Sequence, residues 1–165
     1  MGTRPKIKIE PNGFDKIIEA ASWILMAGFV CFAIYAHYTL PDTIPTHFDA
    51  SGKVDGHGGK ASLLMLPIVA LFTFLLLSII SRYPHYCNYP VEITEWNAEF
   101  QYRNGLRLLR IIKLIMIVIF GSLTVLIFCT AKGLITGMGI APLLIITALP
   151  FIPIIYYVIK AIKGR

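Results

Sequence analysis

Four long stretches without acidic or basic residues dominate this sequence and limit the folds that it can adopt. They are Ala20–Ala36, Ala61–Ser81, Leu114–Ala131 and Gly133–Ile159. A helix rises about 1.5 Å per residue, so roughly 20 apolar residues are needed to cross the ~30 Å hydrocarbon layer of a membrane. Each stretch reaches or nearly reaches that length. The sequence therefore predicts an all-α membrane protein, a bundle of four transmembrane helices.

The composition supports one membrane domain over residues 1–165. Of these residues 56% are hydrophobic and 15% are charged, whereas soluble domains carry about 25% charged residues. The predicted spans are residues 18–39, 61–81, 109–131 and 140–160, joined by an outer loop (40–60) and a cytoplasmic connector (82–108). The fourth stretch contains Pro142, Pro150 and Pro153. We expect its helix to begin near Ile140 and to be kinked or unwound near Pro150–Pro153, because proline removes a backbone donor.

The distribution of basic residues predicts the orientation. Twelve Lys and Arg residues precede the first span, lie between the second and third, or follow the fourth, and the opposite side has three. By the positive-inside rule, the N- and C-termini are cytoplasmic and the loop over 40–60 faces outward. The net charge of +6 then reflects basic flanks that meet the headgroups of the lipid bilayer. No nucleic-acid partner is expected.

The connector is predicted to end in a helix that runs into the third span, with Thr94 as its N-cap and an ion pair between Glu99 and Arg103. Four basic residues recur on one face of this helix at spacings of four, three and three: Arg103, Arg107, Arg110 and Lys113. They are candidates for binding lipid headgroups or a partner. The alternative is ordinary flanking of the membrane by snorkelling side chains.

The outer loop LPDTIPTHFDASGKVDGHGGK contains the candidate metal ligands His47, Asp49, Asp55 and His57. Imidazole and carboxylate groups bind divalent metals. In the alternative interpretation, Asp49 and Asp55 cap turns at Asp49–Gly52 and Asp55–Gly56, next to a short extended piece over 44–48. No catalytic residue is assigned, since the sequence lacks a nucleophile elbow, a phosphate-binding loop and a zinc-protease motif. No cofactor is assigned from the sequence, and a bound divalent metal is the alternative.

The outer loop and the residues around it resemble a known family. Leu40-Pro41, Ile44-Pro45, His47-Phe48-Asp49, Gly52, Asp55-Gly56 and Lys60 are similar to the pattern LPxxIPxHFNxxGxxDxxGxK of DUF1648, a bacterial membrane domain of unknown function. Asp49 stands where the pattern usually has Asn. The same domain forms the first part of SdpI-like proteins, whose named member gives immunity to a secreted toxin and signals its presence.

The resemblance implies a multi-pass protein of the bacterial cytoplasmic (inner) membrane, and because no catalytic residue is assigned, we expect a non-enzymatic role rather than an enzyme. It also implies that the outer loop binds a peptide, a toxin or a membrane partner protein. The binding residues would be those of the motif: Pro41, Pro45, His47, Phe48, Asp49, Gly52, Asp55, Gly56 and Lys60. Two alternatives stay open, namely a metal-binding membrane protein or metalloenzyme, and a loop whose polar residues only hold the loop together. The oligomeric state also stays open.

Overall fold

The computed structural model describes residues 4–164, and in that range four helical segments are long and apolar enough to cross a membrane. The segments are α1 (Gly13–Thr39), the short helix η1 (Lys60–Leu64) continued by α2 (Met65–Ile80), α3 (Ala98–Ala131), and α4 (Ile140–Ala148) followed by α5 (Phe151–Lys163). A further short helix, η2 (Pro84–Tyr86), lies in the connector. The prediction of an all-α membrane protein with four spans is confirmed.

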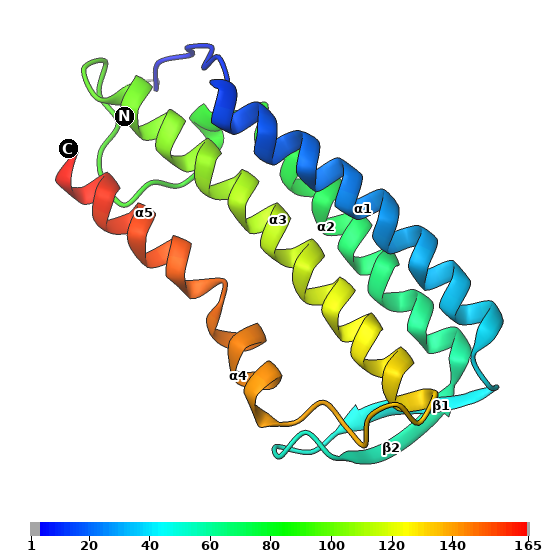
Figure 1. The fold of residues 1–165 in the computed structure, drawn as a ribbon. Helices are drawn as coiled ribbons and strands as arrows, with labels where there is room; N and C mark the ends of the chain where they lie inside the picture. Colours follow the sequence, from blue (N-terminus) through cyan, green and yellow to red (C-terminus); the bar gives the residue numbers. More distant parts are fainter. Residues whose placement is uncertain (1–3, 165) are drawn as a thin grey trace.

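The helix α3 is the centre of the fold. It packs against α1 and α2 on one side and against α5 on the other (Figure 1). The first and last described residues lie at one end of the bundle, and a β-hairpin lies across the other (Figure 1). We call these the terminal end and the hairpin end.

Two apolar clusters hold the first three spans together. One lies in the middle of the bundle and consists of Met26, Phe29, Ala33, Ala70, Phe74 and Ile117. The other lies beneath the hairpin and consists of Ala36, Leu40, Ile44 and Leu63. Many other large apolar side chains of the spans are exposed, among them Ile24 and Phe72. Such surfaces are stable in contact with lipid and not in contact with water.

The outer loop forms two antiparallel strands, β1 (Thr43–Phe48) and β2 (Val54–Gly59). The predicted extended piece over 44–48 is confirmed. The prediction of a turn at Asp55–Gly56 is wrong, because both residues lie within β2. The chain reverses earlier, at Asp49–Lys53. Gly56 instead lets the strands approach, since a Cβ there would lie 2.9 Å from the Cβ of His47.

Side chains fix the first turns of the long helices. In α1, Asn12 accepts a hydrogen bond from the amide of Asp15, whose carboxylate accepts one from the amide of Asn12. This reciprocal cap stabilises a helix start. The predicted N-cap Thr94 is wrong, because α3 begins at Ala98 with Asn97 as its N-cap. Thr94 and Asn97 bond each other's backbone amides and form the turn that precedes the helix.

The fourth segment is broken where the prolines predicted a disturbance. The helix α4 begins at Ile140, as expected, and ends at Ala148, and α5 begins at Phe151. Pro150 has no N–H and cannot continue the hydrogen-bond ladder of α4. In the described part of the chain no residue of α4 is buried, and α4 lies away from α3 (Figure 1). The fourth span is therefore attached to the bundle mainly through α5.

Candidate functional site

The tip of the hairpin is organised by Asp49. Its Oδ1 accepts hydrogen bonds from the Ser51 hydroxyl at 2.7 Å, the Ser51 amide at 2.8 Å and the Lys53 amide at 2.9 Å. The Ser51 hydroxyl, followed by the Lys53 amide, holds the pKa of the Asp49 carboxyl below its usual value. Because the same oxygen accepts all three bonds, it shapes the turn. An Asn at this position, as the family pattern has it, can accept the same bonds.

Gly52 joins the hairpin to the loop between α3 and α4. It has a φ of +79°, which favours glycine. Its carbonyl accepts a hydrogen bond from the Met138 amide at 2.9 Å, and Lys53 pairs with Gly137 in an isolated bridge. A Cβ on Gly52 would lie 2.5 Å from the backbone of Gly139. The motif glycine therefore has a structural role, in a contact that only the tertiary fold creates.

The base of the hairpin is held by Lys60. Its ammonium group lies 3.0 Å from the Asp42 carboxylate and 3.4 Å from the Leu40 carbonyl oxygen. The Lys60 amide donates to the Asp42 carbonyl at 2.9 Å. Ile44 and Pro45 are buried, and Ile44 packs into the apolar cluster beneath the hairpin. These contacts fix the angle at which the hairpin leaves the helices.

The exposed face of the hairpin presents the pair His47 and Asp55. The Nδ1 atom of His47 lies 2.5 Å from Oδ1 of Asp55, and their side chains are 72% and 44% exposed. His57 is also exposed and is paired with Pro45 across the sheet. None of these three side chains contributes to the apolar cluster beneath the hairpin. These three outer-loop side chains are therefore accessible to a ligand.

Among residues 4–164, no group of three or more His, Cys, Asp or Glu side chains is close enough to hold a metal ion. The hairpin brings two of the four candidate ligands together, His47 and Asp55, whereas Oδ1 of Asp49 is bonded within its own turn. A structural metal site usually has four ligands. Metal binding at the hairpin stays a prediction without a third side-chain ligand beside this pair.

A second polar site, which the sequence analysis missed, lies inside the bundle at the terminal end. Asp15 of α1 is almost fully buried, and its carboxylate lies 3.0 Å from Nε of Arg107 and 3.5 Å from a guanidinium nitrogen of Arg110. The ammonium group of Lys113, also buried, lies 2.6 Å from Glu19 and 3.1 Å from the Ser78 hydroxyl. Buried charges are stable only when they are paired. This buried charge cluster connects α1, α2 and α3.

The cluster also shows where the predicted basic face of α3 points. Arg107, Arg110 and Lys113 face the carboxylates of α1, and Arg103 pairs with Glu99 as expected at 2.8 Å. The side chain of Arg103 is 36% exposed. Lipid-headgroup binding by these four residues stays a prediction. The signal in the sequence was the spacing of Asp15 and Glu19, which places two acids on one face of the helix before the first apolar stretch.

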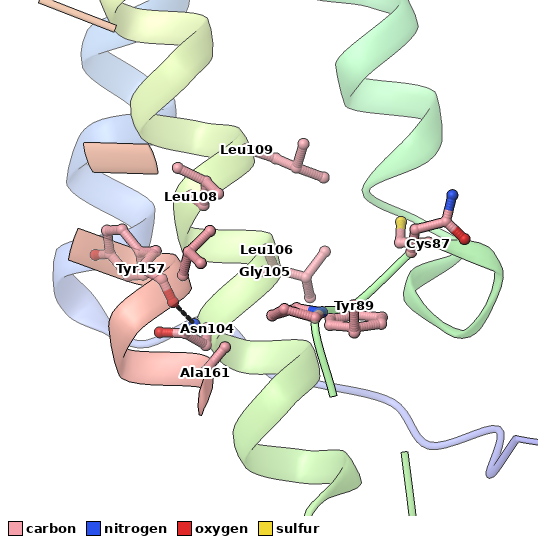
Figure 2. A pocket seen from close by; sticks show the side chains of 12 residues that line it. Cys87, Tyr89, Asn104, Gly105, Leu106, Leu108, Leu109, Tyr157 and Ala161 are labelled. Atoms are coloured by element: carbon pink, nitrogen blue, oxygen red, sulfur yellow. Dashed lines mark hydrogen bonds between the residues drawn. The ribbon is translucent and has the colours of Figure 1, made fainter. Parts of the chain in front are cut away.

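A cavity of about 160 Å³ lies between the connector, α3 and α5 (Figure 2). Its lining includes Tyr89 of the connector, Asn104 and Gly105 of α3, and Tyr157 of α5. The Asn104 side chain donates to the Tyr157 carbonyl at 2.9 Å (Figure 2), but its buried Oδ1 accepts no hydrogen bond from any described residue. Burial raises the pKa of the Tyr89 phenol, whose hydroxyl donates to the Pro84 carbonyl at 3.0 Å.

Comparison with known proteins finds a family match for the region around the hairpin. Residues 23–71 match the family described as a domain of unknown function, DUF1648. An uncharacterized protein of Archaeoglobus fulgidus is 32% identical over 83 residues, which make up 46% of this chain and 45% of that protein. The chain thus spans less than half the length of this relative. No solved structure matches the chain.

Proposed function

Because this chain contains a DUF1648 domain over residues 23–71, we propose that it is a multi-pass membrane protein whose hairpin binds a peptide segment of a partner. The matched region contains most of α1, the whole hairpin and the first part of α2. The helices provide a membrane-embedded base, and the hairpin is the part that extends beyond them (Figure 1). A binding role explains why the hairpin has exposed polar side chains that do not contribute to the packing of the fold.

The observation that carries this proposal is the open edge of β2. Within the described residues, the sheet contains only β1 and β2, and β2 pairs with β1 alone, whereas Lys53, just before β2, pairs with Gly137 of the loop before α4. The other edge of β2 has unpaired backbone donors and acceptors, which is where an extended peptide adds as a further strand. Three of its six residues are Gly, so few side chains obstruct a second backbone.

The neighbouring side chains supply specificity. His47, Asp55 and His57 are exposed, and so is Lys53, which immediately precedes β2. Strand addition derives its affinity from backbone hydrogen bonds and its selectivity from side chains at alternate positions. The hairpin is held at its tip by Gly52 and at its base by Lys60. Because the hairpin is already ordered, it loses little conformational entropy of its own when the peptide binds.

A secreted peptide toxin is one partner of this kind, and the similarity to SdpI-like proteins supports an immunity or signalling role. Its test is survival of toxin-sensitive cells that express the full chain or its His47→Ala/Asp55→Ala variant. We expect protection by the wild type and loss of protection by the variant at equal expression. Equal survival with and without the wild type would remove the immunity role and leave peptide binding to be tested separately.

The test of peptide binding uses a photo-crosslinking amino acid at position 57, in intact cells exposed to secreted peptides. The same group at position 96, which is almost fully exposed at the terminal end, is the matched control. We expect a peptide adduct at 57 and none at 96. A synthetic copy of the crosslinked peptide, N-methylated at three alternate backbone amides, should bind at least tenfold more weakly than the unmethylated peptide. Each backbone hydrogen bond that is lost contributes about 0.5–1.5 kcal/mol. Unchanged affinity after N-methylation would exclude strand addition.

A further inference from the structure

A polar groove opens between α1 and α2 at the terminal end, beside the buried charge cluster. It has a volume of about 530 Å³, and its lining includes Asp15, Lys16 and Glu19 of α1 and Arg82, which follows α2. Arg110 of α3 also reaches the lining. This groove is distinct from the hairpin and lies at the opposite end of the bundle.

The two carboxylates of the groove are already neutralised from within the bundle. Asp15 is almost fully buried and is bonded by Arg107 and Arg110. Glu19 is bonded by Lys113 at 2.6 Å, and Nε of Arg110 lies at 3.9 Å. On the inner side of the groove, three cationic side chains thus face two carboxylates. The interior of the site has an excess of positive charge.

The open side of the groove adds two more cations. Lys16 and Arg82 are exposed and form no ion pair within residues 4–164, although Lys16 lies near Glu10, which pairs with Lys8. The two serine hydroxyls of the lining donate to backbone carbonyls, that of Ser78 to Phe74 and that of Ser81 to Ser78. The cationic donors on the open side of the groove are therefore those of Lys16 and Arg82. Their charge and geometry suit an anion with several oxygen acceptors.

We propose that this groove binds the phosphate of an anionic lipid headgroup. Arg82 comes two residues after the end of α2, and Lys16 lies in the first turns of α1, so both lie where apolar spans end and headgroups begin. Trp23 also lines the groove, and tryptophan is enriched at this depth. A headgroup phosphate held between the two helices fills the groove between α1 and α2 and offsets part of the excess positive charge.

The test compares lipids retained by the purified full chain in a mixture of equal amounts of phosphatidylglycerol and phosphatidylcholine. Native mass spectrometry gives the ratio of the two bound lipids. We expect the wild type to retain phosphatidylglycerol preferentially and Arg82→Gln to lower the ratio about tenfold, through the loss of a direct hydrogen bond between the guanidinium group and the phosphate. Lys163→Gln, which removes the same charge at the same end but outside the groove, should change the ratio less than twofold.

Equal losses in Arg82→Gln and Lys163→Gln, or no preference in the wild type, would overturn the site. If Arg82→Gln folds poorly, Lys16→Gln serves as the second variant. It should lower the ratio of bound phosphatidylglycerol to phosphatidylcholine in the same way. A parallel thermal-unfolding series in neutral detergent adds inorganic phosphate at constant ionic strength. Stabilisation by inorganic phosphate that Arg82→Gln abolishes, without a preference for phosphatidylglycerol, would overturn the lipid as the source of the phosphate.

Discussion

Gly52 shows at the scale of one residue how the hairpin is attached to the bundle. We expect Gly52→Ala to destabilise the protein by at least 1–2 kcal/mol, the approximate cost of a positive φ for a residue with a Cβ, with the clash against Gly139 added. Thermal unfolding in detergent measures the change. The matched control is Gly59→Ala, because Gly59 has a φ of −68° and open space at its Cβ position. Equal effects of the two substitutions would contradict the proposed role of Gly52.

Asp49 makes the tip of the hairpin sensitive to acid. Its pKa is lowered in the folded protein from the ordinary value of 3.8. The stabilisation is therefore fully present above pH 3.8 and is lost as the pH falls through the lower folded pKa. We expect the amide signals of Ser51 and Lys53 in an NMR titration to shift with a midpoint below pH 3.8. In Asp49→Asn they should not shift, and a midpoint above 3.8 in the wild type would contradict the assignment.

Lys113 carries a charge that the bundle interior must neutralise. Lys113→Met leaves Glu19 without its 2.6 Å partner. We expect a loss of about 2–3 kcal/mol, below the 3–5 kcal/mol typical of broken buried pairs because Glu19 is partly exposed. The double variant Lys113→Met/Glu19→Gln should recover part of this stability. Arg103→Met breaks the more exposed pair with Glu99 and should cost less than about 1 kcal/mol, so equal losses at both sites would contradict the role of burial.

At the scale of the element, Pro150 determines where the fourth segment is broken. We expect Pro150→Ala to join α4 to α5 in one helix with a kink at Pro153, because the missing N–H at position 150 and the clash of its ring with the preceding turn are both removed. Spin labels at positions 144 and 159 measure this by pulsed electron paramagnetic resonance, since a straight helix separates them by about 22 Å along its axis. Pro142→Ala is the control, because Pro142 lies in the first turn of α4, where proline is tolerated. An unchanged distance in Pro150→Ala would show that packing of α5 against α3 causes the break.

At the scale of the whole molecule, the positive-inside rule predicts that the hairpin end faces outward. Single cysteines at positions 57 and 96, in a variant without Cys31, Cys87 and Cys129, lie at opposite ends of the bundle. We expect a membrane-impermeant maleimide to label position 57 in intact cells and position 96 only after permeabilisation. The reverse pattern would contradict the orientation and would place the proposed peptide site inside the cell.

The four spans follow from the sequence because lipid imposes a simple requirement. A segment of about 20 apolar residues must satisfy its backbone internally and therefore forms a helix wherever it lies in the chain. The disturbance at Pro150 was equally local, because proline acts on its own turn of helix. The hairpin was only half predictable, since Asp55 and Gly56 have the composition of a turn but are held in a strand by their pairing with β1.

Two features were decided only by the tertiary structure. The contact of Gly52 with Gly139 joins residues far apart in the sequence, and the pairs of Asp15 with Arg107 and Glu19 with Lys113 span more than 90 residues. Read along the chain, those basic residues appear only as a flank of the third span. The sequence alone determined which segments cross the membrane, because that depends on the hydrophobicity of each segment. Which charges are buried and paired depends on how the helices are rotated against one another, and only the packed bundle specifies that rotation.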